Sequence, residues 1–188
     1  MIILSFGSNL PSKWGNRAET LNFAVNLLKD LSISVISCST FYFSPPMGLR
    51  HGKNIKTYKT TTNNASIQND FNLPNQHYIN IALCVRSQKP ASQLLYGLKQ
   101  IEKMAGRKHG QRWASRPLDI DIIDYKQIAL GGTRQYNQKL DTGFIPLTLP
   151  HPGLATRAFV LEPMAEIAPF WHHPKTGKTA RQMLNELK

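Results

Sequence analysis

Two aspartates, Asp119 and Asp121, lie one residue apart in the segment RWASRPLDIDII, which runs from residue 112 to residue 123. Apolar residues alternate with them as in a β-strand, so both carboxylates are expected on one face. Carboxylates this close repel one another unless cations lie between them. They suit Mg²⁺, which takes one or two carboxylates and completes its coordination with water and phosphate oxygens. The alternative is a solvated sheet face that carries two acids and no ion.

Four basic residues precede these aspartates within a short stretch: Arg107, Lys108, Arg112 and Arg116. Arginine binds phosphate oxygens through two parallel hydrogen bonds and stays charged at every relevant pH. A plain solvated surface gives no reason for so many cations beside paired carboxylates. Together with metal ions, the same cations would bind a polyphosphate. Trp113, between two of the arginines, is either a side chain folded onto the core or a ring that covers a bound heterocycle.

A second candidate binding pair is Tyr78 and Asn80, which alternate with isoleucines in a strand-like run. The two side chains are therefore expected on one face of a sheet. An aromatic ring beside an amide, which has both a donor and an acceptor, suits a flat, nitrogen-rich heterocycle. Taken alone, the pair is equally compatible with solvated sheet residues.

The composition favours an anionic partner. The chain has 188 residues, with 23 Lys and Arg against 11 Asp and Glu and a formal charge of +12. This balance is typical of proteins that bind nucleic acid, anionic lipid or phosphorylated small molecules, and it does not choose among them. The sequence shows no transmembrane run, no signal peptide and no cysteine spacing typical of a metal site. We therefore expect a cytoplasmic protein in which Cys38 and Cys84 are buried free thiols.

The elements that must position these residues follow the order strand, helix, strand, strand, helix, strand. Their expected ranges, with two short C-terminal helices added, are 2–6, 15–31, 33–43, 77–85, 90–106, 118–125, 156–166 and 179–187. This order predicts a ferredoxin-like α+β fold, a mainly antiparallel sheet with helices packed on it. One domain is expected over 1–188, interrupted by a polar segment at about 49–76 that is either a functional lid or a disordered insertion.

Six segments in order resemble the motifs of one enzyme family: FGSNL, FYFSPPMG, YIN, IEKMAGR, RWASRPLDIDII and LPHPGLATRAFVLEPMAEIAP. Together they are similar to the 6-hydroxymethyl-7,8-dihydropterin pyrophosphokinase family of folate biosynthesis, from residue 1 to about 170 apart from the insertion. The resemblance implies an ATP-dependent diphosphotransferase that moves the β,γ-diphosphate of ATP to the hydroxymethyl group of the pterin and releases AMP. It also implies two Mg²⁺ ions.

The resemblance implies a role for each matching residue. Asp119 and Asp121 would ligate both metal ions, and Arg107 and Arg116 would be the catalytic arginines of a mobile loop. The pterin would be bound by Ser44, Pro45, Met47, Tyr78, Asn80 and Phe159. The ATP side would be formed by Glu102, Arg112, Trp113, Ile122, Thr148, His151 and Arg157.

The chain departs from the family pattern at several positions near this site. The insertion at about 49–76 lengthens a loop that normally helps to cover the pterin. His109 lies where a second basic residue is usual, and Pro146 lies where many members carry a basic residue. Ser115 replaces the usual proline before the second catalytic arginine, and Pro117 follows that arginine. These changes leave the metal site intact and bear on ATP affinity and loop dynamics.

Two other functions are compatible with parts of the pattern. RNA-recognition domains share the order of strands and helices and the basic charge, but residues 77–85 lack the aromatic-rich run that such domains need. A member that binds pterin or nucleotide without catalysis would not need the retained arginines and aspartates. We therefore expect no specific nucleic acid and no membrane partner. Members of the family are often monomers, and the sequence leaves open an association with other folate-pathway enzymes.

Overall fold

The computed structural model describes residues 1–45, 58–59, 77–107, 115–131 and 147–187. Its elements are β1 Ile2–Ser8, α1 Arg17–Leu27, the 3-10 helix η1 Leu28–Leu31, β2 Ser34–Cys38, β3 Tyr42–Ser44, β4 Tyr58–Lys59, β5 Tyr78–Arg86, α2 Ala91–Met104, β6 Asp119–Tyr125, the 3-10 helix η3 Leu154–Thr156, α3 Ala158–Ile167 and α4 Ala180–Glu186. No helix within these ranges has both the length and the apolar character that crossing a membrane requires.

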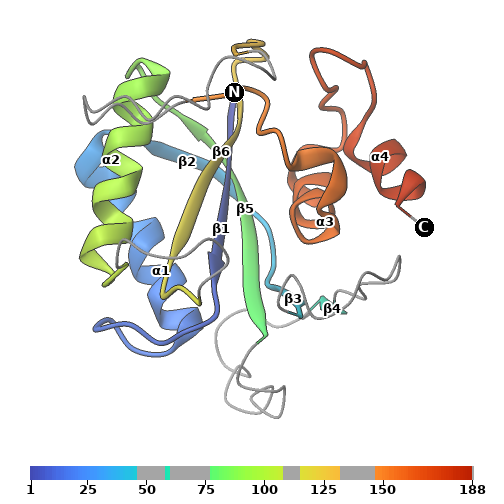
Figure 1. Cartoon of the computed structure of the whole chain (residues 1–188). Helices are drawn as coiled ribbons and strands as arrows, with labels where there is room; N and C mark the ends of the chain where they lie inside the picture. Colours follow the sequence, from blue (N-terminus) through green and yellow to red (C-terminus); the bar gives the residue numbers. More distant parts are fainter. Residues whose placement is uncertain (46–57, 60–76, 108–114, 132–146, 188) are drawn as a thin grey trace.

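The described strands pair in an antiparallel sense throughout (Figure 1). Their order across the sheet is β4–β3–β5–β1–β6, and β2 also pairs with β5. β1 therefore lies between β5 and β6, and each of the two long helices connects strands that are not neighbours. This is the ferredoxin-like α+β arrangement expected from the sequence, and that prediction is confirmed.

Two layers of apolar side chains cover opposite faces of the sheet. On the first face, α1 and α2 pack against Leu4, Phe6 and Ile120. The apolar residues of both helices recur every three or four positions, which places them on one side of each helix. On the second face, α3 and α4 pack over Ile3 and Ile123. The same strands carry polar residues farther along this second face, and these form the site described below.

The strand expected at 33–43 is two strands. β2 ends at Cys38 and β3 begins at Tyr42. Between them, the amide and the hydroxyl of Thr40 each donate a hydrogen bond of 3.0 Å to the carboxylate of Glu166 on α3. Because this contact takes the Thr40 amide out of the strand ladder, the strand is interrupted. The partner lies 126 positions away in the sequence, so local periodicity could not reveal the break.

The cysteines and the long polar segment differ in part from expectation. Cys84 is buried as predicted, but Cys38 is exposed, and both thiols are free. Cys38 lies at the end of β2, which pairs with β5 alone in the described part of the sheet. The segment at about 49–76 contains β4, which pairs with β3, so it includes some regular structure. The rest of that segment, with the prediction about its order, lies outside the described residues.

Candidate active site

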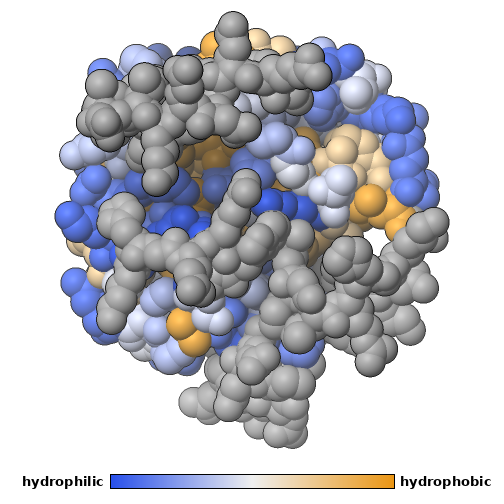
Figure 2. All heavy atoms as spheres, viewed as in Figure 1, coloured by the Kyte–Doolittle hydropathy of each residue, from blue (hydrophilic) through white to orange (hydrophobic). Residues whose placement is uncertain are grey.

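The polar residues of the candidate site form rows across three neighbouring strands on the second face of the sheet. Gly7 on β1 is in register with Asn80 on β5 and with Asp119 on β6. Two residues earlier on β1, Ser5 is in register with Asp121. Asn80 and Asp119 are therefore separated by two strand spacings, roughly 10 Å. In Figure 2, hydrophilic residues gather near the centre of the view, and more hydrophobic residues lie toward α3.

Gly7 leaves open space between Asn80, the candidate heterocycle-binding residue, and Asp119, the candidate metal ligand. A Cβ atom at this position would lie 3.3 Å from Asn80 Oδ1 and 3.8 Å from Tyr78 Cδ1. A glycine within a strand often marks a place where a ligand approaches the backbone closely. Gly7 was not among the site residues expected from the sequence, although it lies in the FGSNL motif.

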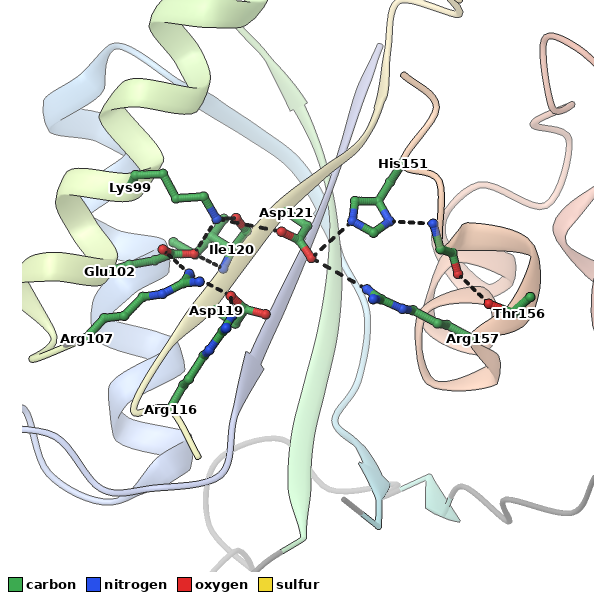
Figure 3. A network of polar contacts seen from close by, with 11 residues as sticks. Lys99, Glu102, Arg107, Arg116, Asp119, Ile120, Asp121, His151, Thr156 and Arg157 are labelled. Atoms are coloured by element: carbon green, nitrogen blue, oxygen red, sulfur yellow. Dashed lines mark hydrogen bonds and ion pairs between the residues drawn. The ribbon is translucent and has the colours of Figure 1, made fainter. Parts of the chain in front are cut away.

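Asp119 is held by two arginines, one from each side of residues 108–114. Its Oδ1 atom accepts hydrogen bonds from Arg107 at 2.7 Å and from Arg116 at 2.9 Å (Figure 3). Burial by itself would raise the pKa of Asp119, but the charges of Lys99, Arg107 and Arg116 outweigh burial and lower that pKa. The structure thus brings both expected catalytic arginines to the first expected metal ligand.

Asp121 faces a second group of nitrogen atoms. Its carboxylate lies 3.7 Å from Lys99 Nζ, 3.7 Å from His151 Nε2 and 3.8 Å from Arg157 (Figure 3). Burial lowers the pKa of His151 even though the charge of Asp121 acts in the opposite direction, so the imidazole is neutral at neutral pH. His151 Nδ1 accepts a hydrogen bond from the Gly153 amide at 3.1 Å. The single imidazole proton is therefore on Nε2, on the side of Asp121.

Glu102 and Lys99 form the buried part of this network, where α2 packs on β6. The Glu102 side chain is only 1% exposed, and its Oε1 accepts from Lys99 Nζ at 2.7 Å and from the Ile120 amide at 2.5 Å. Its Oε2 pairs with Arg107, and Lys99 Nζ also donates to the Ile120 carbonyl at 2.7 Å. Burial raises the pKa of Glu102, while the charges of Lys99 and Arg107 act in the opposite direction. Glu102 therefore joins α2 to β6 through Oε1, while its Oε2 holds Arg107, which in turn reaches Asp119.

Asn80 faces the site with one end of its amide. The residue is 2% exposed, and its Nδ2 donates to Ser44 Oγ at 3.0 Å and to the Tyr42 carbonyl at 3.3 Å. A backbone carbonyl only accepts hydrogen bonds, so the amide nitrogen must point toward β3. The amide oxygen is the end that lies toward Gly7.

The other residues expected around a pterin surround this part of the sheet. Burial, with the nearby charge of Asp119, raises the pKa of Tyr78, so its phenol stays neutral. Pro45 follows β3 directly and is half-buried. Phe159 lies in the first turn of α3, with the guanidinium carbon of Arg157 6.0 Å from the centroid of its ring. Arg157 in turn faces Asp121, so this contact links α3 to the carboxylate pair.

A family model for 7,8-dihydro-6-hydroxymethylpterin-pyrophosphokinase (HPPK) matches residues 3–169. The chain belongs to the HPPK family. The 2-amino-4-hydroxy-6-hydroxymethyldihydropteridine pyrophosphokinase of Synechocystis sp. is 38% identical over 117 residues, which are 62% of this chain and 54% of that protein. The Aquifex aeolicus protein of the same name is 26% identical over 98% of this chain and 91% of its own length. The predicted family and the predicted enzyme class, a pyrophosphokinase, are confirmed.

Larger proteins also contain an HPPK part. The Plasmodium falciparum HPPK-DHPS structure with pteroate has a TM-score of 0.65 and 16% identity over 98% of this chain, which spans 40% of that chain. At this identity the likeness shows the fold alone. The mitochondrial folate synthesis bifunctional protein of Arabidopsis thaliana is 26% identical over 88% of this chain and 23% of its own length.

The remaining residues expected in this HPPK-family site lie in different places. Ile122 belongs to the core beneath α1 and α2, so its side chain points away from the site face. Thr148 lies beside Gly131, where an added Cβ would be 3.2 Å from the Thr148 hydroxyl. Lys99 was not singled out from the sequence, although its spacing of three residues before Glu102 was a usable signal. Five positions lie outside the described residues: Met47, His109, Arg112, Trp113 and Pro146.

Proposed function

We propose that this chain transfers the β,γ-diphosphate of ATP to the hydroxymethyl oxygen of 6-hydroxymethyl-7,8-dihydropterin. A bond forms between that oxygen and the β-phosphorus, the bond from the β-phosphorus to the α,β-bridging oxygen breaks, and AMP leaves. The hydroxyl proton passes to solvent. The observation that carries the proposal is the row of Asn80, Gly7 and Asp119, which sets a heterocycle-binding amide across one open strand from a carboxylate flanked by arginines. Membership of the HPPK family supports the choice of substrates.

The pterin end of the proposed site recognises a hydrogen-bond donor. The Asn80 amide nitrogen is already used by Ser44 and the Tyr42 carbonyl, so its oxygen is the atom that meets the ligand. A reduced pterin carries N–H groups on its ring edge, which this oxygen can accept. Tyr78 and Phe159 supply aromatic surface for the flat ring, and Pro45 closes its edge.

The phosphate end is proposed to hold Mg²⁺ through Asp119 and Asp121, two ions by resemblance to the family. The donor set fits this ion, because two carboxylates on one face leave the remaining positions to water and phosphate oxygens. Structural zinc takes four protein ligands, whereas the described part of the chain contains no group of three or more His, Cys, Asp and Glu side chains able to hold a metal. When bound, Mg²⁺ would neutralise phosphate charge and activate the attacking hydroxyl.

The basic residues around the carboxylates have distinct proposed tasks. Arg107 and Arg116, both within 3 Å of Asp119, stabilise the charge that develops on the departing AMP. His151 and Arg157 approach Asp121 from the α3 side and bind the nucleotide phosphates. Positioning and charge stabilisation are the main requirements of this reaction, and no protein nucleophile is needed.

The wider setting follows from the relatives. We propose that residues 1–188 form a single HPPK domain that acts in the cytoplasm as a monomer. Proteins named HPPK-DHPS and folate synthesis bifunctional protein join such a domain to another within one chain. An association of this chain with other folate-pathway enzymes is therefore part of the proposal.

The deciding experiment measures release of AMP from ATP by the purified chain with 6-hydroxymethyl-7,8-dihydropterin. We expect release that requires the pterin, stops when EDTA removes the metal, and resumes when Mg²⁺ is added in excess. AMP formed at the same rate without the pterin would show simple ATP hydrolysis. The absence of AMP in the complete mixture would contradict the proposed reaction.

A further inference from the structure

Asn9 forms three hydrogen bonds within the described part of the chain, and all three join it to Ser115 or Arg116. The residue is 3% exposed. Its Oδ1 accepts a hydrogen bond from the Arg116 amide at 2.7 Å, and its Nδ2 donates to Ser115 Oγ at 3.1 Å. Its own amide donates to the Arg116 carbonyl at 3.2 Å. These bonds join the end of β1 to residues more than 100 positions later in the chain.

The contacts of Asn9 fix the backbone of Arg116 on both sides of its Cα atom. One bond holds the amide and another holds the carbonyl, and Pro117 further restricts Arg116 because a residue before proline avoids the helical region. The guanidinium of Arg116 then reaches Asp119 at 2.9 Å. An arginine side chain has several rotatable bonds, so the fixed backbone limits where its charge can lie.

We propose that Asn9 is a positioning residue for Arg116, and that the Ser115 hydroxyl is its second anchor. The inference rests on the proposed function, in which Arg116 stabilises charge on the phosphates. Asn9 acts on the reaction through Arg116, by holding its backbone just before β6 begins. A purely structural role would stabilise the fold without a specific link to the rate.

A double-mutant cycle separates these two roles. Asn9→Ala removes two side-chain hydrogen bonds. We expect it to lower kcat roughly tenfold, with a smaller change in KM for ATP and for the pterin. In an Arg116→Ala background, the same substitution should leave kcat unchanged, because the residue through which Asn9 acts is already absent. An equal loss of kcat in both backgrounds would overturn the proposal.

If Asn9→Ala reduces the yield of folded protein, milder substitutions at Ser115 test the same link. Ser115→Ala removes one hydrogen bond and should lower kcat in the same direction, whereas Ser115→Thr retains the hydroxyl and should restore the rate. An unchanged kcat in Ser115→Ala would remove Ser115 from the proposal. Asn22→Ala, at an exposed position of α1, is the matched control and should leave kcat and KM unaltered.

Hydrogen exchange gives a readout that does not depend on turnover. Followed by mass spectrometry, the Arg116 amide should exchange faster in Asn9→Ala than in the wild type, while the amides of α2 should exchange at unchanged rates. Unchanged protection of Arg116 would overturn the proposed contact even if the chain released no AMP. Release of AMP by the wild type tests the proposed function separately.

Discussion

Asn80 and Asp119 face one another across Gly7, each paired in register with it on opposite edges of β1. The backbone of Gly7 is outside the left-handed region, so alanine is compatible with its conformation. A methyl group there would nevertheless lie 3.3 Å from Asn80 Oδ1, on the surface proposed for the substrates.

Gly7→Ala is therefore expected to impair ligand binding more than folding. We expect KM for the pterin to rise roughly tenfold, because the methyl group blocks the close approach that glycine permits. Thermal unfolding should change little. Steady-state kinetics with each substrate varied in turn will measure the effect, and an unaltered KM for the pterin would show that the ligand lies elsewhere.

Asp121→Ala should abolish AMP release while the protein stays folded. The substitution removes a proposed metal ligand from a partly exposed face. The Asp121 carboxylate lies 3.7 Å from Lys99 and 3.8 Å from Arg157, so its ion pairs contribute little to stability. We expect a rate loss of roughly a hundredfold or more and a melting temperature within a few degrees of the wild type. Near-native turnover would refute the metal assignment, and Asp30→Ala, at an exposed position, is the control.

Arg116→Ala should reduce the rate more than it reduces nucleotide affinity. Arg116 is proposed to act on charge that develops during the reaction, so its loss falls mainly on the transition state. We expect kcat to fall roughly a hundredfold and the ATP dissociation constant, measured by calorimetry, to rise less than tenfold. Equal losses in both quantities would mean that Arg116 serves ground-state binding instead.

Asp124→Asn should stabilise the protein at neutral pH. Burial raises the pKa of Asp124, which is fully buried, while the Gln127 amide, which donates to Oδ2, and the neighbouring Trp171 side chain act in the opposite direction. Between the ordinary aspartate pKa, about 3.9, and the raised value, the folded state binds more protons than the unfolded state, so stability falls as pH rises.

The neutral amide of the Asp124→Asn variant avoids that cost. Its melting temperature should exceed that of the wild type at pH 7, and the difference should shrink as the pH approaches 4. Calorimetric unfolding of both proteins at several pH values is the measurement. A gap of the same size at pH 4 and pH 7 would mean that the effect is not linked to ionisation. Asp30→Asn supplies the exposed control.

The sequence was sufficient to predict which side chains share a face. Alternation in LDIDII placed Asp119 and Asp121 together, as the structure shows. Leu94 and Leu98 lie four positions apart in the helix expected at 90–106, a helical spacing, and both are in the core. Both patterns depend only on the local repeat of a strand or a helix. The order of the motifs predicted the family, because six segments in a fixed order are far more specific to one family than any single segment.

Features that depend on register or packing between distant segments could not be predicted. Gly7 became a site residue only when its pairing with Asn80 and Asp119 was known. The spacing of Lys99 and Glu102 signals an ion pair on α2, but the contact of Lys99 Nζ with the Ile120 carbonyl depends on the packing of α2 on β6. In each case the deciding partner lies far along the chain, beyond the reach of a short sequence window.

The pairing of β5, β1 and β6 has a consequence for substrate selection. The separation between the proposed pterin and phosphate ends is set by the spacing of hydrogen-bonded strands, so the main chain fixes that distance. Side-chain substitutions can weaken the binding of either substrate, but they leave this main-chain distance unchanged. A pterin analogue with a longer hydroxyalkyl chain is therefore expected to place its hydroxyl oxygen beyond the β-phosphorus. Substitutions of surface side chains should not restore the correct distance between the two atoms.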